Sequence, residues 1–357
     1  MRRQDEGGRT DNVDGRHGTA DRKADHIRIA LEESVEGRGV TNGFERYRFK
    51  HSALPEIDYA DVRLDTSFLG RKLGAPLLVS SMTGGTPATG RINRTLAAAA
   101  EARGWAIGLG SARSALEREQ LAETFQVRRE APTALLLANL GAVQLNYGMG
   151  VDHCLRAVEL AEADMLVLHL NALQETFQPE GNTNFRGLMK RIEEVCSRLE
   201  VPVGVKEVGW GIDGSTARRL AEAGASFIDV AGAGGTSWSQ VEKFRNPDAV
   251  AREAADAFAD WGIPTAECVR EVRAALGSSY PVIASGGLHT GVEAAKAIAL
   301  GANMAGFGRA LLRDAVDSAE KLVARLSRVE KELRTAMFAI GAADVVSLGG
   351  TDRLMRT

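Results

Sequence analysis

Eight short apolar runs, spread along most of the chain, constrain its fold more than any other feature. Each run is continuous rather than alternating, which is typical of strands that are covered on both faces. Most runs end in glycine, serine, asparagine or a charged residue, and most are followed by a stretch of helical period. The runs are 75–82, 105–111, 134–141, 165–171, 202–209, 227–234, 281–287 and 304–310.

This alternation predicts a closed (β/α)₈ barrel, with an open doubly wound sheet as the alternative. Most runs begin about 25–40 residues after the previous one, the spacing of βα units. The expected helices include 91–104, 215–225 and 291–302, and the long gap after the sixth run has room for an insertion beside a helix near Cys268–Leu276. We expect four segments: a disordered tail (1–20), an N-terminal extension (21–74), the barrel with a helical tail (75–340) and a C-terminal tail (341–357).

Charge and composition exclude several classes of protein. The chain has 44 Lys and Arg against 47 Asp and Glu, a net charge of −3, which gives no reason to expect nucleic acid or an anionic membrane as a partner. No apolar run approaches the ~18–20 residues of a membrane span, and the N-terminus has no signal-peptide core. Three scattered cysteines indicate reduced thiols without zinc. We expect a cytoplasmic enzyme.

Polar residues gather where the predicted strands end, which is the functional face of a barrel. Ser285-Gly286-Gly287 and Gly308-Arg309-Ala310 end the seventh and eighth strands, where paired glycines and helix N-termini hold phosphate. The alternative is two glycine turns without a ligand. Lys206, at the end of the fifth strand, pairs either with Glu207 or with an electron-rich cofactor group. Together with Met82-Thr83-Gly84-Gly85, these features suggest flavin mononucleotide (FMN).

Other polar residues have both a functional and a structural interpretation. Glu175 is either a magnesium ligand or a solvated loop glutamate, and a lone His169 is more often a core histidine than a catalyst. Arg22, Lys23 and His26 lead into a predicted helix, where cations oppose the helix dipole unless an anion binds them. The sequence contains no Ser-His-Asp order and no G-x-S-x-G motif.

In their order along the chain, these motifs resemble one known family, the type 2, FMN-dependent isopentenyl diphosphate isomerases. The resemblance runs from about Arg22 to the end of the predicted barrel. It rests on RKADHI, FKHSALPEID, SSMTGG, GSARSAL, ANLGA, HLNALQE, VPVGVKEVGWG, DVAGAGGTSW, ASGGLHTG and GRALL. One departure is visible, since Ala112 stands where the family has Gln.

The resemblance implies a role for each matching residue. FMN would contact Ser81, Met82, Thr83, Ser111, Asn139, Lys206 and Thr236, with its phosphate on Gly286, Gly287, Gly308, Arg309 and Ala310. The substrate diphosphate would meet Arg22, Lys23, His26, Ser111 and Arg113. Catalysis at the isoprenyl end would involve His169, Asn171 and Gln174, while Trp238 and Glu242 would cover the pocket. Glu175 would hold Mg²⁺.

The resemblance also implies the reaction, which moves the double bond of isopentenyl diphosphate to give dimethylallyl diphosphate. Reduced FMN would deliver and accept the proton, with Gln174 as a relay, and NADPH would only reduce the flavin. Family members form homo-tetramers or homo-octamers, for which 311–340 offers contacts.

Three alternatives share the same barrel. An FMN-dependent 2-hydroxy acid oxidoreductase needs a His base and an Arg clamp after strands six and seven, where His289 is the only nearby histidine. An enzyme of the inosine monophosphate dehydrogenase type needs a loop cysteine. A non-catalytic phosphate-binding barrel would not need His169, Gln174, Glu175 and the RKADH segment around one mouth.

Overall fold

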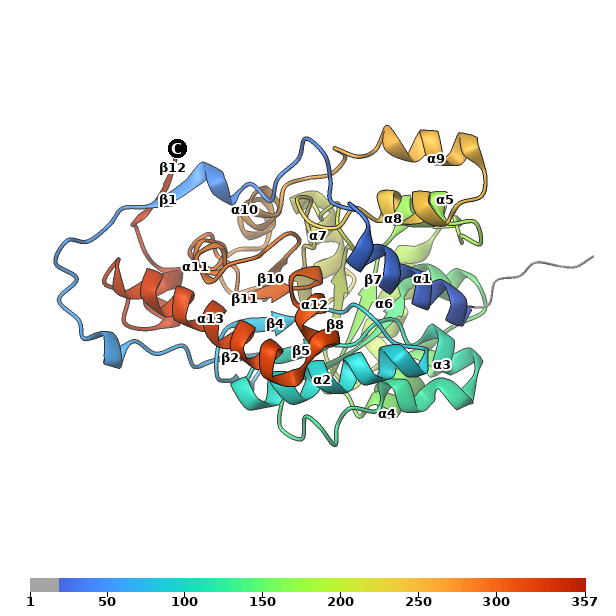
Figure 1. Cartoon of the computed structure of the whole chain (residues 1–357), viewed down its shortest axis with the longest axis horizontal. Helices are drawn as coiled ribbons and strands as arrows, with labels where there is room; N and C mark the ends of the chain where they lie inside the picture. Colours follow the sequence, from blue (N-terminus) through green and yellow to red (C-terminus); the bar gives the residue numbers. More distant parts are fainter. Residues whose placement is uncertain (1–18) are drawn as a thin grey trace, which may run out of the picture.

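The computed structural model describes residues 19–357 and confirms the predicted barrel (Figure 1). All eight apolar runs form its parallel strands, and none belongs to an open sheet. The strands are β4 (Leu77–Val79), β5 (Ala106–Gly108), β6 (Leu136–Gly141), β7 (Met165–His169), β8 (Val203–Lys206), β9 (Phe227–Asp229), β10 (Val282–Ser285) and β11 (Met304–Phe307). The predicted disordered tail lies outside the described residues, except for Thr19 and Ala20, which begin a helix.

The barrel closes where β11 pairs with β4, with Ala305 opposite Leu77. Its interior is filled by one face of the strands, including Leu137, Met165 and Phe227. The antiparallel hairpin of β2 (Thr66–Phe68) and β3 (Arg71–Leu73) adds to this core, since the Phe68 ring lies 5.5 Å from that of Phe227. The other strand face packs against the surrounding helices, which explains why the runs do not alternate.

Helices follow the strands and surround the barrel. Thr86 caps α2 by accepting a hydrogen bond from the Thr89 N–H, and Pro87 at the first position sets its start, four residues before the predicted one. The helices of the barrel are α2 (Pro87–Arg103), α3 (Arg113–Glu117), α4 (Val151–Ala161), α5 (Ala172–Phe177), α6 (Leu188–Arg198), α7 (Gly214–Glu222), α10 (Thr265–Leu276), α11 (Gly291–Ala299), α12 (Arg309–Asp317) and α13 (Ala319–Phe338).

The insertion after the sixth barrel strand is confirmed as a helix pair. It consists of α8 (Trp238–Arg245) and α9 (Ala249–Asp256), and it lies beside α5 and α1 at the right-hand end of Figure 1. None of the helices between residues 19 and 357 is long and apolar enough to cross a membrane.

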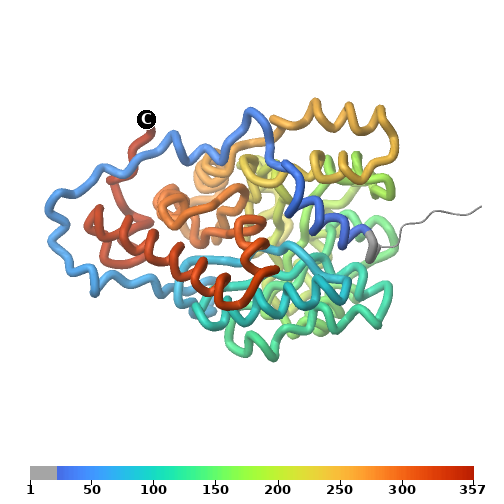
Figure 2. The backbone as a smooth tube through the Cα atoms, in the orientation of Figure 1, coloured from blue at the N-terminus to red at the C-terminus, as the bar shows by residue number. Residues whose placement is uncertain are grey.

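The N-terminal extension begins with α1 (Thr19–Glu32), which already contains the RKADH segment predicted to precede it. The extension then runs along the molecule, as the blue tube in Figure 2 shows, through short 3₁₀ turns and β1 (Tyr47–Phe49). Strand β1 pairs antiparallel with β12 (Leu354–Arg356). The predicted C-terminal tail is therefore structured, since it forms α14 (Val345–Gly349) and β12.

Candidate active site

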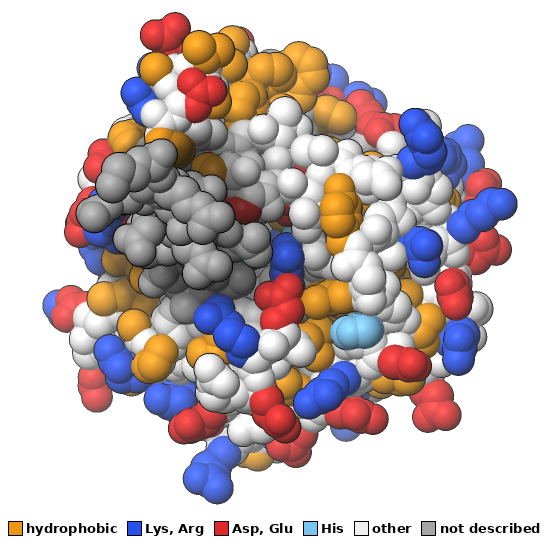
Figure 3. All heavy atoms as spheres, turned by 90° about the vertical axis from the view of Figure 1, so that its right-hand side faces the viewer, with side chains coloured by type: hydrophobic (Ala, Val, Ile, Leu, Met, Phe, Trp, Pro, Cys, Tyr) orange, Lys and Arg blue, Asp and Glu red, His pale blue; other side chains and the backbone are white. Residues whose placement is uncertain are grey.

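Two adjoining hollows lie where the barrel strands end. We call them the glycine pocket, with about 700 Å³ of empty space, and the polar pocket, with about 660 Å³. They share one wall, formed by Ser81, Met82, Lys206, Val208 and Trp238. Figure 3 faces the end of the molecule that carries α5 and α9, where exposed charges of both signs are interspersed rather than gathered into one basic patch.

The glycine pocket is built from two loops, 232–235 and 286–287, whose backbones lie in close contact. Gly286 and Gly287 have φ angles of 109° and 75°, and a Cβ atom on either would lie within 2.3 Å of a backbone oxygen of the neighbouring loop. Gly308 precedes the first turn of α12, so the free N–H groups of that turn lie at this pocket. The remaining predicted cofactor residues of this pocket are Ser81, Met82, Lys206, Thr236, Arg309 and Ala310.

These residues fit a cofactor that carries a phosphate. Backbone N–H groups at a helix N-terminus and between paired glycines are typical phosphate ligands. The hydroxyl groups of Ser80 and Thr83 are buried and have no hydrogen-bond partner among the described residues. Because an unpaired buried hydroxyl costs free energy, that of Ser80, which lines the glycine pocket, favours a bound polar group there. Thr83, predicted to contact FMN, is buried and does not line this pocket.

Lys206 places a cation on the shared wall and is only 7% exposed. Its ammonium group donates to the backbone carbonyl of Glu207. The Glu207 carboxylate instead accepts the N–H groups of Val208, Gly209 and Trp210 at 2.6–2.8 Å. Burial raises the pKa of Glu207 despite these hydrogen bonds. The structure therefore shows no ion pair between the side chains of Lys206 and Glu207, which was the predicted alternative.

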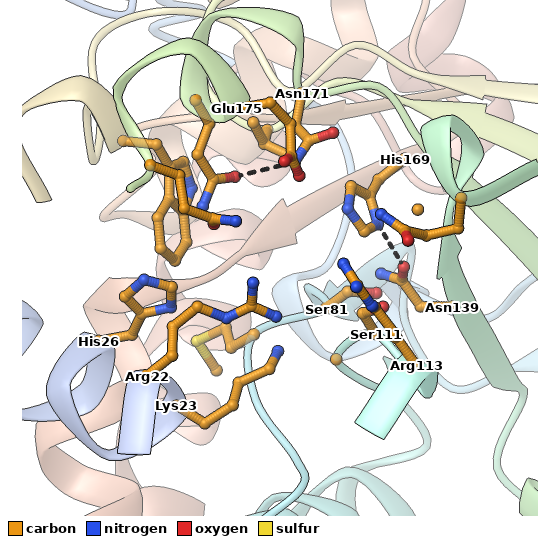
Figure 4. A pocket seen from close by; sticks show the side chains of 18 of the residues that line it. Arg22, Lys23, His26, Ser81, Ser111, Arg113, Asn139, His169, Asn171 and Glu175 are labelled. Atoms are coloured by element: carbon orange, nitrogen blue, oxygen red, sulfur yellow. Dashed lines mark hydrogen bonds between the residues drawn. The ribbon is translucent and has the colours of Figure 1, made fainter. Parts of the chain in front are cut away.

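The polar pocket brings α1 opposite the strand ends (Figure 4). Arg22 and Lys23 project from α1 toward Ser111 and Arg113, whereas His26 on the same helix faces Glu242. Burial, and then the neighbouring Arg22, lowers the pKa of Lys23 to about 7. The cationic side chains that line the polar pocket repel one another unless an anion binds between them.

A buried hydrogen-bond network holds the far side of the polar pocket. Glu242 is fully buried and accepts from Gln174 Nε2 at 2.9 Å, lies 2.9 Å from His26 Nε2, and accepts from Arg245 Nη1 at 2.6 Å. Arg245 also contacts Glu180. Burial lowers the pKa of His26, while the neighbouring Glu242 opposes that shift. Glu242 thus lies behind the pocket rather than over it, whereas Trp238 does line both hollows.

His169 is held as a neutral imidazole. Its Nδ1–H donates to Asn139 Oδ1 at 2.8 Å, which leaves the lone pair on Nε2. Burial, with the charges of Lys206 and the α1 cations, lowers the pKa of His169 to about 3. The ring is at the pocket surface, so His169 is not simply a core histidine.

Glu175 is only 5% exposed, so its interpretation as a solvated loop glutamate is wrong. Its two oxygens accept from Asn171 Nδ2 at 2.7 Å and from the Asn182 N–H at 2.5 Å. Among residues 19–357, no group of three His, Cys, Asp or Glu side chains could hold a metal ion by itself. A Mg²⁺ ion at Glu175 would therefore take its other ligands from water and from a bound diphosphate.

Comparisons with known proteins show the family to which the chain belongs. The chain matches the family model for FMN-dependent dehydrogenases over residues 17–168 and 155–354. It is 52% identical to the isopentenyl-diphosphate delta-isomerase of Oceanobacillus iheyensis, over 94% of this chain and 96% of that protein. The protein of the same name from Nostoc sp. is 53% identical, over 95% of this chain and 96% of that protein. The chain belongs to the isopentenyl-diphosphate delta-isomerases, within the FMN-dependent dehydrogenase family.

Solved structures show how widely this fold is shared beyond the isomerase family. A putative lactate oxidase of Pediococcus acidilactici aligns with a TM-score of 0.67 at 17% identity, over 94% of each chain. A variant of flavocytochrome b2 aligns with a TM-score of 0.68 at 18% identity, over 92% of this chain and 82% of that chain. At such identities the likeness concerns the fold alone.

Several residues of this isomerase-family site did not emerge from the sequence. Gln144, Gln178 and Glu36 line the pockets, and Arg245 and Glu180 support them. Arg245 follows Glu242 by three residues, which on a helix places both on one face; this spacing was a usable signal. For the others the sequence carries no signal, because their position depends on how loops distant in sequence meet.

Proposed function

We propose that this chain converts isopentenyl diphosphate to dimethylallyl diphosphate, with FMN in the glycine pocket and the substrate in the polar pocket. The observation that carries the proposal is the shared wall of the two pockets. It would put the flat face of a cofactor against the carbon chain of a molecule whose diphosphate lies among the α1 cations. The names of the close relatives support the same reaction.

Reduced FMN would supply the acid and base for the proton shift, and NADPH would serve only to reduce it. The residues of the chain position the reactants. Arg22, Lys23 and Arg113 bind the diphosphate, whose binding energy orients carbons that lie far from it.

Gln174, fixed between Glu242 and Asn171, presents a polar group of defined orientation beside the isoprenyl end. Trp238 excludes water from the junction of the pockets. Lys206 favours an electron-rich cofactor on the shared wall.

An anaerobic assay tests the proposal, with isopentenyl diphosphate, FMN, NADPH and Mg²⁺ supplied and the products analysed. Formation of dimethylallyl diphosphate only with reduced flavin supports it. If flavin binds but is bleached by a 2-hydroxy acid without any isomerisation, the chain is an oxidoreductase. Absence of both flavin and turnover would leave a phosphate-binding barrel. The cytoplasmic location and the homo-tetramer or homo-octamer stay predictions.

Arg113→Ala is expected to raise KM for isopentenyl diphosphate about 10- to 100-fold, the effect of losing a charge-assisted hydrogen bond. The guanidinium is held toward the pocket by Glu117 at 2.7 Å and by Asn182 at 3.3 Å. Steady-state kinetics measure the change, with Arg156→Ala on the surface of α4 as the control. An unchanged KM would show that the diphosphate binds elsewhere.

Glu175→Gln is expected to raise the Mg²⁺ concentration for half-maximal activity about tenfold or more, because the variant lacks the charge that a magnesium ligand contributes. Gln keeps the size of the side chain and can still accept from Asn171 or Asn182. A Mg²⁺ titration of activity measures the effect, and Glu119→Gln, on an exposed side chain, is the control. Identical titrations would remove Glu175 from the metal site.

A further inference from the structure

The side chain of Arg309 does not point where a phosphate ligand would. Its Nε donates to the Ala30 carbonyl at 2.8 Å, Nη1 donates to Glu36 Oε1 at 2.7 Å, and Nη2 lies 3.5 Å from the Glu33 carbonyl. We propose that Arg309 is a positioning residue that ties α1 to α12 and so couples the cofactor phosphate to the substrate-binding cations. This inference rests on the proposed function.

The carbonyls that Arg309 contacts need a donor. Helix α1 ends at Glu32, and the last intrahelical-type bond runs from the Glu33 N–H to the Ile29 carbonyl. The carbonyls that follow have no further helical N–H to bind. Arg309 donates a hydrogen bond to the carbonyl of Ala30, and its positive charge interacts favourably with the C-terminal end of the helix dipole. The guanidinium therefore fixes the end of α1 with a rigid, multiply bonded fork.

The segment after α1 forms part of the glycine pocket. The Gly37 N–H donates to the Gly235 carbonyl at 3.2 Å, and the Ser237 N–H donates to the Val35 carbonyl at 2.7 Å. Glu36, between them, lines the pocket. An unpaired carboxylate there would repel a phosphate, and Arg309 neutralises it. Arg309 thus acts on the cofactor pocket through Glu36 and on the polar pocket through α1.

The coupling follows from this geometry. A phosphate bound by the backbone of Gly308 and of the first turn of α12 immobilises Arg309, the first residue of that helix. The fork then immobilises α1, which carries Arg22, Lys23 and His26 into the polar pocket. Binding of FMN should therefore order α1 and prepare the site for the diphosphate, and by linkage the substrate should tighten FMN binding.

The test compares wild type with Arg309→Ala, Arg309→Lys and Arg313→Ala. Arg313, on the same helix one turn later, makes one long contact of 3.5 Å to the Leu31 carbonyl and is the matched control. FMN affinity is measured by fluorescence titration, and amide hydrogen exchange of residues 22–32 is measured with and without FMN. Arg309→Lys keeps the positive charge beside Glu36 but loses the several hydrogen bonds of the guanidinium. It is the conservative variant to measure in case Arg309→Ala fails to fold.

We expect FMN to slow exchange in α1 of the wild type and of Arg313→Ala but not of Arg309→Ala, with Arg309→Lys between them. FMN affinity of Arg309→Ala should stay within about threefold, while KM for isopentenyl diphosphate rises about tenfold at a nearly constant kcat. A large loss of FMN affinity with the α1 response intact would mean that the guanidinium binds the phosphate, and would overturn the proposal.

The same exchange data separate this proposal from the proposed function. If FMN protects α1 only when Arg309 is present, yet isopentenyl diphosphate is not converted, the coupling stands and the assigned reaction fails. If the reaction proceeds but FMN leaves α1 exchange unchanged in the wild type, the coupling fails and the reaction stands.

Discussion

Gln174→Ala should lower kcat about 10²- to 10⁴-fold, the range expected when a positioned proton-transfer group is lost, while FMN affinity stays unchanged. Gln174 is 8% exposed, and its amide is fixed because Nε2 donates to Glu242 and Oε1 lies 3.3 Å from Asn171 Nδ2. It lines the polar pocket and not the glycine pocket, so its removal leaves the cofactor contacts intact.

Single-turnover kinetics with reduced FMN, together with an FMN titration, measure both quantities. Thr176→Ala is the control, because Thr176 lies on the same helix but is exposed. A variant that keeps full turnover would remove Gln174 from the chemistry. A variant that loses FMN would show that the two pockets are not separate binding sites.

Glu242→Gln should change how stability depends on pH. Burial alone would raise the pKa of Glu242, but the neighbouring His26 and Arg245 and the hydrogen bond from Gln174 lower it to about 2. The folded protein therefore favours the ionised form, relative to an ordinary pKa of 4.5. This stabilisation is fully present above pH 4.5 and is lost as the pH falls toward 2.

Urea unfolding at a series of pH values measures the difference between wild type and Glu242→Gln. The stability advantage of the wild type over Glu242→Gln should shrink by about 2 kcal/mol between pH 7 and pH 3, so the two curves converge on acidification. Glu253→Gln, at an exposed position of the neighbouring α9, is the control. Parallel curves for wild type and Glu242→Gln would show that the carboxyl titrates alike in the folded and unfolded states.

The barrel could be predicted because each strand is covered on both faces. A doubly buried strand leaves a continuous apolar run in the sequence, whatever its neighbours are. The ends of α2 were harder to place, since its start depends on the Thr86 cap rather than on apolar period. No helix or strand was predicted within 341–357, because β12 has three residues and pairs with β1, far away in sequence.

Some residues of the two pockets could likewise be predicted from the sequence, and others could not. Residues at strand ends, such as His169 and Lys206, were placed by the barrel rule alone, and the structure brings both to the pocket wall. Glu242 was found only through the family resemblance, and its position behind Gln174 depends on how the insertion folds back. The orientation of Arg309 could not be predicted, because it depends on where the end of α1 crosses α12.

The pairing of β1 with β12 joins a strand near the start of the chain to the last strand of the chain. Strand β12 is synthesised about 300 residues after β1, so the extension waits for its partner until the whole barrel has been made. Strand β1 therefore cannot gain its partner strand before the residues of all eight barrel strands have been synthesised.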